Sequence, residues 1–586
     1  MNFTSGLLHC LSTLTLIFTV VCTSAQSQIL LDGTFDDWSS ISGSYTDATG
    51  DGGNSGIDFK KINIHNNREY VFLYLEVGSE INLQDLNDIA VYIDIDNNAN
   101  TGTRINGVGA EITYSFGDRS GTYNGSRIGH ANIGIITAPT VTSSTFEIAI
   151  NRNLNVNGTN IFIDNTVNVM FKDNAINGDI APNISGGLAY QLTDHQQPSL
   201  PSYQIAKHAL SDLRILSYNV ERDGFFEANR EAAYTRILQA VQPDIIGFQE
   251  IYGNTSLQVA NRVEAILPSA TDVQWFHSYQ EPDCHAISRY PITKSAPIPG
   301  SSGSGNAAFL IDIPDTETDM LFIVAHPPCC NNNTGRQLEV DRIMQFVREA
   351  KLGNGPIPIQ ENAPIVIVGD MNFVGDGNQL QTLLTGNIAD EASFGTDFTP
   401  DWDGSNLQDS EPYSTGVPFS YTWYSPGSSF SPGKLDYILY SGSNLQLENT
   451  YSLFTPGLQS DSLTKYNLEG NDVIVASDHL PVVSDFSLKN KTTIGIKELD
   501  NDAHQLALSP NPVSAQASLS FNHTGGLVHL YLIGSNGKEL VELYNEILTK
   551  GDQQIAFDLS DIRSGIYTIR LITKEGTSYK RLMVVR

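Results

Sequence analysis

The chain has 586 residues, which is too many for one hydrophobic core and predicts roughly three to four domains. Its hydrophobic content of 40% is that of a globular protein, and 33 basic against 65 acidic residues give a net charge of −32. This charge disfavours a cytoplasmic nucleic-acid binder, which is usually basic. It favours solubility in a salty exterior, or acids that hold cations.

Residues 1–25 have the features of a secretory signal peptide. The apolar run from Leu14 to Val21 is followed by Thr23-Ser24-Ala25, a small-residue cleavage pattern, although no Lys or Arg precedes the run. A lipoprotein site at Cys22 fits poorly because Val21 precedes it. No other run is long enough to span a membrane, so we expect an exported protein.

Three cysteines remain after the predicted signal peptide, which contains Cys10 and Cys22. They are Cys284, Cys329 and Cys330. Because exported proteins can form disulfides, we expect Cys284 to pair with one of the adjacent two, or those two to pair with each other. Their spacing has no zinc pattern.

Residues 27–195 predict an all-β domain. The segments 70–77 and 89–95 alternate or run apolar between Asn, Gly and Asp turns, which is typical of a β-sandwich. The segments 31–38 and 94–102 resemble domains of carbohydrate-binding module family 9, which implies a glycan ligand. Trp38 could stack on that sugar or lie in the core.

The turn after residue 93 offers a candidate calcium site. Asp94, Asp96, Asn98 and Asn100 stand at alternate positions and could ligate calcium through oxygen. A polar hairpin turn explains the same residues equally well.

Residues 196–210 predict a linker, and from 211 to 488 strands alternate with helices. Apolar residues at helical spacing predict helices over 234–241, closed by Pro243, and over 338–347. Apolar runs predict strands over 213–218, 244–250, 321–325, 365–370, 434–440 and 480–486.

Polar side chains stand at the ends of these predicted strands. A single Asp or Asn there is an ordinary turn former, and a single His is more often structural than catalytic. Together they supply what phosphodiester hydrolysis needs. The set is Asn219, Gln249-Glu250, His326, Asp370, Asn372, Asp436, Asp478 and His479.

The acids of this set suit a divalent metal. Glu250 can hold the ion, with Asp478 as a further or second-metal ligand, and hard carboxylate oxygens suit Mg²⁺, Mn²⁺ or Ca²⁺. The metal would neutralise the phosphate. Asp370 is placed to orient or deprotonate the attacking water.

The neutral and basic members suit the phosphate. Asn219 and Asn372 can donate to non-bridging oxygens. His479 can grip the phosphate while Asp436 fixes its tautomer. His326 can serve as a second general acid or phosphate contact. Arg336 could contact phosphate, or could be a solvated charge at a helix start.

This set, in this order, resembles the endonuclease/exonuclease/phosphatase superfamily, whose members include pancreatic-type deoxyribonuclease. The resemblance spans about 211–488 and implies a four-layer α/β sandwich of two packed sheets, dependence on a divalent metal such as Mg²⁺, and cleavage of phosphate esters. The neighbours of His326 resemble the secreted deoxyribonuclease type. The matching segments are 217–219, 248–250, 287–292, 369–372, 435–438 and 477–479.

Charge bears on the substrate. Residues 211–488 contain 13 Lys and Arg against 35 Asp and Glu, a net of −22, which weakens the nuclease interpretation because a nonspecific DNA grip relies on cations. No apolar hairpin or amphipathic helix supports a lipid substrate, and no basic pocket supports an inositol phosphate. We predict a secreted phosphodiesterase, an endonuclease first, with a phosphatase or lipid phosphodiesterase as alternatives. A non-catalytic glycan-binding surface protein is the alternative from another class.

After a second linker at 489–504, residues 505–586 predict a small β-sandwich. The segments 508–512, 533–538, 559–567 and 580–586 resemble the C-terminal sorting domain of type IX secretion. This resemblance implies export by that machinery to the cell surface or medium.

Overall fold

The computed structural model describes residues 29–53, 55–153, 155–156, 159–162, 166–193, 200–269, 274–280, 283–300, 305–314, 316–489, 506–534, 539–574 and 576–586. The predicted signal peptide, Cys10, Cys22, and parts of both predicted linkers lie outside these residues. The chain divides into two compact units at about residue 490. Within the described residues, every helix is too short or too polar to cross a membrane.

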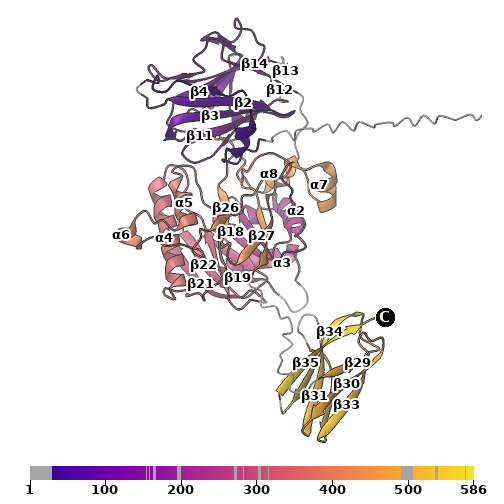
Figure 1. The fold of residues 1–586 in the computed structure, drawn as a ribbon. Coiled ribbons are helices and arrows are strands. Elements are labelled where there is room, and N and C mark those ends of the chain that lie inside the picture. Colours follow the sequence, from indigo (N-terminus) through magenta and orange to yellow (C-terminus); the bar gives the residue numbers. More distant parts are fainter. Residues whose placement is uncertain are drawn as a thin grey trace, which may run out of the picture. The chain divides into compact units, whose positions relative to one another are not determined.

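The first unit begins with a β-sandwich, as predicted (Figure 1). One sheet consists, in spatial order, of β1 (Tyr45–Thr46), β2 (Phe59–Asn66), β3 (Tyr70–Ile81), β11 (Ser143–Asn151) and β10 (Ile136–Ala138). The other consists of β15 (Ile180–Ala181), β14 (Thr166–Asp173), β4 (Ile89–Asp94), β7 (Ile112–Ser115), β8 (Ser120–Tyr123) and β9 (Ser126–Ile128), with β16 (Leu188–Gln191) paired to β14.

The central strand β3 is buried on both faces. Val71, Leu73 and Leu75 point into the core between the two sheets of the sandwich. Phe72 and Tyr74 alternate with them and join a different core, which continues into the α/β domain that follows. This double burial explains why the segment is almost continuously apolar and not a simple alternation.

The sandwich and the following α/β domain are therefore joined by a shared core. Leu31 donates its backbone N–H to the Pro418 carbonyl at 2.9 Å and forms a bridge with Phe419. Trp38 lies in the same core and donates through Nε1 to Glu147 at 2.8 Å. Its indole is a core group, so the alternative of sugar stacking is wrong.

The predicted calcium turn is only partly as expected. Asp94 and Asp96 lie together, and one ligand atom from each lies within 4.8 Å of one from Glu111. Asn98 and Asn100 are exposed instead, because the turn uses the Asn98 backbone N–H to bond Asp94 at 3.1 Å and directs the amides outward. Glu111, which lies just before β7, is the third potential ligand, where the prediction had Asn98 and Asn100.

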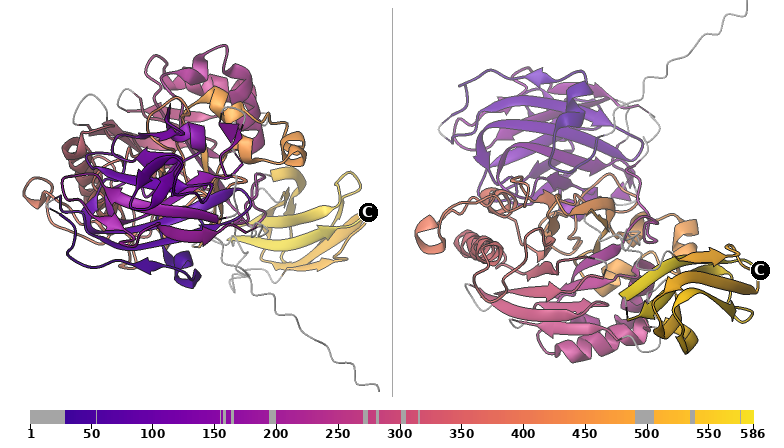
Figure 2. Two further views of the ribbon diagram at one scale, coloured as in Figure 1. Left: turned by 90° about the horizontal axis from the view of Figure 1, so that it is seen from above. Right: turned by 60° about the horizontal axis from the view of Figure 1, so that its bottom comes forward.

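The α/β domain contains two six-stranded sheets packed face to face, as predicted (Figure 2). The first has the order β19 (Phe276–Tyr279), β20 (His285–Ser288), β18 (Ile245–Gln249), β17 (Leu213–Asn219), β28 (Val482–Leu488) and β27 (Leu445–Ser452). The second has the order β21 (Ile292–Pro299), β22 (Gly305–Ile311), β23 (Met320–Ala325), β24 (Ile365–Asp370), β26 (Asp436–Tyr440) and β25 (Gln408–Asp409).

Helices cover the outer faces of these sheets. The main ones are α2 (Glu231–Val241), α3 (Ser256–Ile266), α4 (Asn333–Lys351) and α5 (Asn378–Thr385). Shorter helices are α6 (Glu391–Phe394), α7 (Ser460–Tyr466) and α8 (Asp472–Ala476). The predicted helices 234–241 and 338–347 correspond to α2 and α4, and α4 is longer at both ends.

Alternate residues of each central strand face different layers. In β24, Val366 and Val368 enter the core between the sheets, whereas Ile365 and Ile367 face the helical layer that contains α4. Gly247 of β18 permits the close approach of the sheets, since a Cβ there would lie 2.6 Å from a Val368 methyl group. The result is the four-layer sandwich that the resemblance implies.

The second unit is a small β-sandwich of its own. One sheet consists of β29 (Ala507–Ser509), β30 (Gln516–His523) and β33 (Gly551–Asp558). The other consists of β32 (Glu539–Leu548), β31 (Gly526–Ile533), β34 (Gly565–Thr573) and β35 (Gly576–Val584). Leu519, Leu530 and Leu571 lie fully buried in its core.

The three cysteines among the described residues are thiols, so both predicted pairings, Cys284 with one of the adjacent two and Cys329 with Cys330, are wrong. Cys284 is buried in the core between the sheets, where its thiol donates to the Gly305 carbonyl at 3.3 Å. Cys329 and Cys330 are exposed in the loop after β23. Cys284 packs in the core and therefore cannot reach Cys329 or Cys330, which face solvent.

Candidate active site

Strand ends bring five polar residues to one edge of the paired sheets. The parallel strands β17 and β18 end at Asn219 and one residue before Glu250. The parallel strands β23 and β24 end one residue before His326 and at Asp370. Parallel neighbours share their carboxyl-end edge, which is where open α/β folds place their sites. β26 is antiparallel to β24 and starts with Asp436 opposite Asp370.

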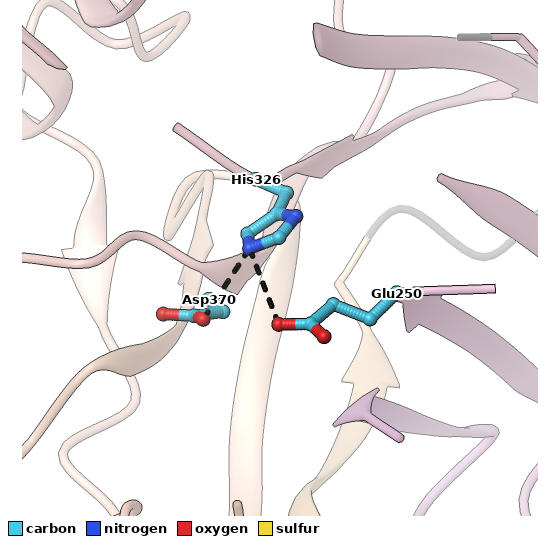
Figure 3. A group of neighbouring side chains, drawn as sticks. All are labelled: Glu250, His326 and Asp370. Atoms are coloured by element: carbon cyan, nitrogen blue, oxygen red, sulfur yellow. Dashed lines mark ion pairs between the residues drawn. The ribbon is translucent and has the colours of Figure 1, made fainter. Parts of the chain in front are cut away.

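Glu250, His326 and Asp370 form the first cluster (Figure 3). The Nε2 atom of His326 lies 3.6 Å from Oδ2 of Asp370 and 3.9 Å from Oε1 of Glu250. The side-chain amide of Asn219 donates to the same two oxygens at 3.0 Å each. Three potential ligand atoms therefore point toward one small space.

This donor set fits a hard divalent cation. One ligand atom from each of Glu250, His326 and Asp370 lies within 4.8 Å of the others, and two of the three are carboxylate oxygens. Glu250 is held in a left-handed conformation with φ of 63°, while its other oxygen accepts the Arg222 backbone N–H at 2.9 Å. The Arg222 backbone N–H thus orients one oxygen of its carboxylate, while the other oxygen faces Nε2 of His326 at 3.9 Å. A carboxylate oxygen is a hard ligand of the kind that divalent cations such as Mg²⁺ and Ca²⁺ prefer.

His479 and Asp436 form the second part of the site. Nδ1 of His479 lies 2.8 Å from Oδ2 of Asp436, and its Nε2 lies 3.4 Å from Oδ2 of Asp370. Thr422 Oγ1 also donates to Asp436 at 2.8 Å. Burial opposes the imidazolium, but the charges of Asp436 and Asp370 outweigh it and raise the pKa of His479 to about 10.

His326 has a carboxylate partner that the sequence analysis missed. Its Nδ1 forms a hydrogen bond with Oδ2 of Asp283, a buried residue just before β20. Burial opposes the charge, but this bond and the nearby acids raise the pKa of His326 to about 9. Since β18 and β20 pair antiparallel with Phe248 opposite His285, the register puts Asp283 opposite Glu250. Only the strand pairing could have revealed this partner.

Asp370 lies at the centre of the site and connects both histidines. Gly369 sets its position, because this residue has φ of 146° and a Cβ would lie 1.9 Å from the Ala325 carbonyl oxygen. Burial raises the pKa of Asp370 to about 6, with His479 and His326 opposing and Asp436 adding to the increase. This carboxyl can therefore exchange a proton close to neutral pH.

Family comparison agrees with this geometry. The model of the endonuclease/exonuclease/phosphatase family matches residues 216–479, which include every strand end described above. This segment is an endonuclease/exonuclease/phosphatase domain. The secretion system C-terminal sorting domain matches residues 507–585, so the second unit is a sorting domain of the type IX system. No curated protein matches the chain.

Solved structures with similarity cover about half of this chain. The human Nocturnin catalytic domain is 16% identical with a TM-score of 0.31, over 48% of this chain and 96% of that one. ANGEL2, a 2′,3′-cyclic phosphatase, is 15% identical with a TM-score of 0.33, over 50% and 99%. Sphingomyelinase C from Streptomyces griseocarneus is 16% identical with a TM-score of 0.27, over 47% and 99%. These values are too low to transfer a substrate to this chain.

Asn219 and Asn372, the two asparagines that the sequence analysis singled out, both lie in this site. Asn219 uses both amide N–H groups on Glu250 and Asp370, so it orients the acids in this structure. Asn372 donates its backbone N–H to Asp370 at 3.0 Å and its side-chain amide to the Pro327 carbonyl at 3.0 Å. It links the Asp370 turn to the His326 loop.

Asp478 lies beside this cluster and not in it. Its carboxylate is half-buried and accepts the indole N–H of Trp423 at 3.1 Å. The potential metal ligands at this site form two groups among the described residues, Glu250 with His326 and Asp370, and Asp370 with Asp436 and His479, and neither group includes Asp478. The structure therefore gives no support to its predicted role as a metal ligand. Trp423, which the sequence analysis missed, bonds Asp478 and forms a backbone bridge with His479.

Arg336 fits neither of its two predicted roles, a phosphate contact or a solvated charge at a helix start. Its side chain in α4 is fully buried. The guanidinium donates to the carbonyls of Pro328 at 2.9 Å and Cys330 at 2.8 Å, and to the Gln379 amide oxygen at 3.1 Å. Arg336 thus holds the loop after His326 in place by bonding its carbonyls, and acts as a positioning residue.

Proposed function

We propose that this protein is a secreted, divalent-metal-dependent phosphodiesterase that cleaves extracellular nucleic acid as an endonuclease. The observation that carries the proposal is the meeting of Glu250, His326 and Asp370 beside the His479–Asp436 pair at one edge of the two sheets. The sorting domain supports the extracellular location. Magnesium is the proposed ion, with manganese or calcium as alternatives.

Glu250 would hold the ion, with a carboxylate oxygen of Asp370 beside it. When bound, a divalent metal neutralises the phosphate and the charge that develops on it. Asp370 orients the attacking water and takes its proton, because its raised pKa of about 6 suits a base near neutral pH. The water oxygen then forms the new bond to phosphorus as the bond to the leaving oxygen breaks.

The two imidazoles act on the phosphate oxygens. His479, protonated and oriented by Asp436, donates from Nε2 to a non-bridging oxygen. His326, held through Nδ1 by Asp283, gives its Nε2 proton to the leaving oxygen. The proton taken by Asp370 balances the proton that His326 gives, so the site ends the reaction with its charge unchanged.

The substrate class rests on weaker grounds than the chemistry. The net charge of −22 over residues 211–488 disfavours a broad electrostatic grip on DNA. A phosphatase or lipid phosphodiesterase would use the same catalytic groups. The non-catalytic alternative is disfavoured, because all catalytic residues are present and hydrogen-bonded to one another. Burial of Trp38 removes the one aromatic platform that supported a glycan ligand.

The candidate calcium site near Asp94 stays a proposal with a revised ligand set. Glu111 is buried, and its Oε1 accepts no hydrogen bond from the described residues. Asp94 and Asp96 supply further oxygens within 4.8 Å. An ion there would stabilise the sandwich and take no part in hydrolysis.

The test is hydrolysis by the whole chain, since residues 211–488 share a core with the sandwich. Double-stranded DNA, RNA, bis-p-nitrophenyl phosphate and sphingomyelin are offered with Mg²⁺, Mn²⁺, Ca²⁺ or EDTA. We expect metal-dependent cleavage of nucleic acid that Asp370→Ala abolishes. Cleavage of the small diester or lipid alone would move the substrate class. No hydrolysis with any metal would overturn the proposal.

A further inference from the structure

A second acidic cluster lies in the N-terminal sandwich, outside the catalytic domain. Asp47, Asp51 and Asp179 each place a carboxylate oxygen within 4.8 Å of those of the other two. Asp47 directly follows the edge strand β1, and Asp179 directly precedes β15 in the opposite sheet. The cluster therefore brings together residues 132 positions apart in sequence, which local turn formation does not explain.

Two of the three carboxylates are buried. Asp47 is 7% exposed and Asp179 is 3% exposed, whereas Asp51 faces solvent. Asp179 accepts backbone N–H groups from Phe59 at 2.6 Å and Ile180 at 2.7 Å. These two bonds orient its carboxylate without neutralising its charge.

The observation that most directly indicates a bound ligand concerns one carboxylate oxygen of Asp47. Its Oδ1 accepts the side-chain amide of Asn183 at 3.1 Å, and that same amide donates to Asp51 at 2.7 Å. Its Oδ2 is buried and accepts no hydrogen bond of ordinary geometry from the described residues, and the Ala48 backbone N–H and the Tyr45 hydroxyl only assist the charged form of this carboxylate from nearby. A buried carboxylate oxygen without a donor is costly unless a cation coordinates it.

The described residues provide no positive side chain for these acids. None of the ion pairs found among them includes Asp47, Asp51 or Asp179, and the neighbouring Lys60 pairs with Asp58. Three adjacent carboxylates repel one another in proportion to their burial. Within the described residues nothing balances this charge, and a bound cation would do so.

We infer that Asp47, Asp51 and Asp179 bind a divalent cation, with calcium as the ion that this all-oxygen set suits best. Calcium accepts six to eight oxygen ligands, mixes carboxylates with carbonyls and waters, and occupies sites of extracellular modules at millimolar concentrations. The ion links the edges of the two sheets, because Asp47 leaves one sheet and Asp179 enters the other. It is a structural site, separate from both the active site and the Asp94 turn.

The test uses the full chain, freed of metal by EDTA and dialysed. Calcium binding is counted by isothermal titration calorimetry for the native chain, Asp47→Asn, and the control Asp88→Asn, which changes an exposed acid of the same sandwich. We expect Asp47→Asn to bind one calcium fewer per chain, and Asp88→Asn to match the native chain. Equal stoichiometry in all three would overturn the inference.

Thermal unfolding supplies a second measurement, because calcium should change which of the two chains, native or variant, has the higher unfolding temperature. Without calcium, Asp47→Asn should unfold at the native temperature or above, since one of three repelling charges is gone. With calcium, the native chain should gain more than the variant. An equal calcium-dependent gain would overturn the site. If Asp47→Asn fails to fold, the exposed Asp51→Asn replaces it, with calcium affinity expected to fall roughly tenfold or more.

Discussion

The buried acids of the catalytic domain and those of the N-terminal sandwich have different partners. Asp436 lies 2.8 Å from His479, and Asp283 bonds His326, so each catalytic dyad contains its own base. Asp47 and Asp179 face each other and an amide. The negative charge of the active-site acids is therefore partly neutralised by the histidines before any metal binds, whereas the sandwich cluster needs a bound ion to balance its negative charge.

The largest expected effect follows from breaking the His479–Asp436 dyad. His479→Gln removes the imidazolium that we place on the phosphate and should lower kcat for bis-p-nitrophenyl phosphate by about a thousandfold. The matched control is His529→Gln, since His529 pairs with Glu542 at 3.1 Å in the sorting domain. Equal activity of both variants would contradict the assigned role.

Breaking the other dyad should have a smaller effect. Asp283→Asn keeps the shape of the His326 partner but removes its charge, so we expect a ten- to hundredfold loss of activity. The pKa of His326 should also fall, and the acidic group in the pH–rate profile should move to lower pH. A variant with an unchanged profile would show that Asp283 is structural only.

Arg336 is a buried charged residue that differs from both acid clusters, because its guanidinium donates to neutral carbonyls and amides. Arg336→Met should destabilise the chain by about 3 kcal/mol, because it leaves buried acceptors unpaired. Urea unfolding measures this loss. A variant of native stability with a raised KM would restore the phosphate-contact role that the structure argues against.

The two acid clusters should also differ in how pH affects stability without metal. His326 and His479 have folded-state pKa values raised to about 9 and 10, above the usual 6.5. Their stabilisation is complete below pH 6.5 and is lost as pH rises through 9 to 10. Unfolding temperatures in EDTA should fall across this range by several degrees, and His479→Gln should flatten the decline. A rise with pH would contradict the pairing.

The acid cluster of the sandwich should affect stability in a lower pH range. Burial, followed by the charges of Asp179 and Asp51, raises the pKa of Asp47 to about 6. A raised carboxyl pKa means that stability is greatest below the unfolded value near 4 and declines as pH rises through 6. In EDTA we expect this shallow decline in the native chain and its absence in Asp47→Asn. Saturating calcium should remove the decline in the native chain.

Much of the fold could be predicted because apolar periodicity reflects layers. The central strands of the catalytic domain are buried on both faces, as in β24, so their apolar runs stand out. The site residues at the strand ends could be predicted as well, because strand ends of both sheets converge on one edge. Asp370, His326 and Glu250 meet there as expected.

The remaining features depend on contacts that no local pattern contains. Asp283 lies opposite Glu250 only through the pairing of β18 with β20. Arg336 resembles a surface charge in sequence, yet the loop after His326 folds over it. The shared core was also hidden, because Phe72 and Tyr74 look like ordinary sandwich residues until Phe419 packs on the same side.

The measurement closest to the central claim is a metal titration of hydrolysis by the native chain and Glu250→Gln. If Glu250 holds the catalytic ion, the variant should need at least tenfold more Mg²⁺ for half-maximal activity and should regain part of its kcat at high Mg²⁺. Asp370→Asn should regain none. An unchanged Mg²⁺ requirement for Glu250→Gln, or full activity of either chain in EDTA, would contradict the account.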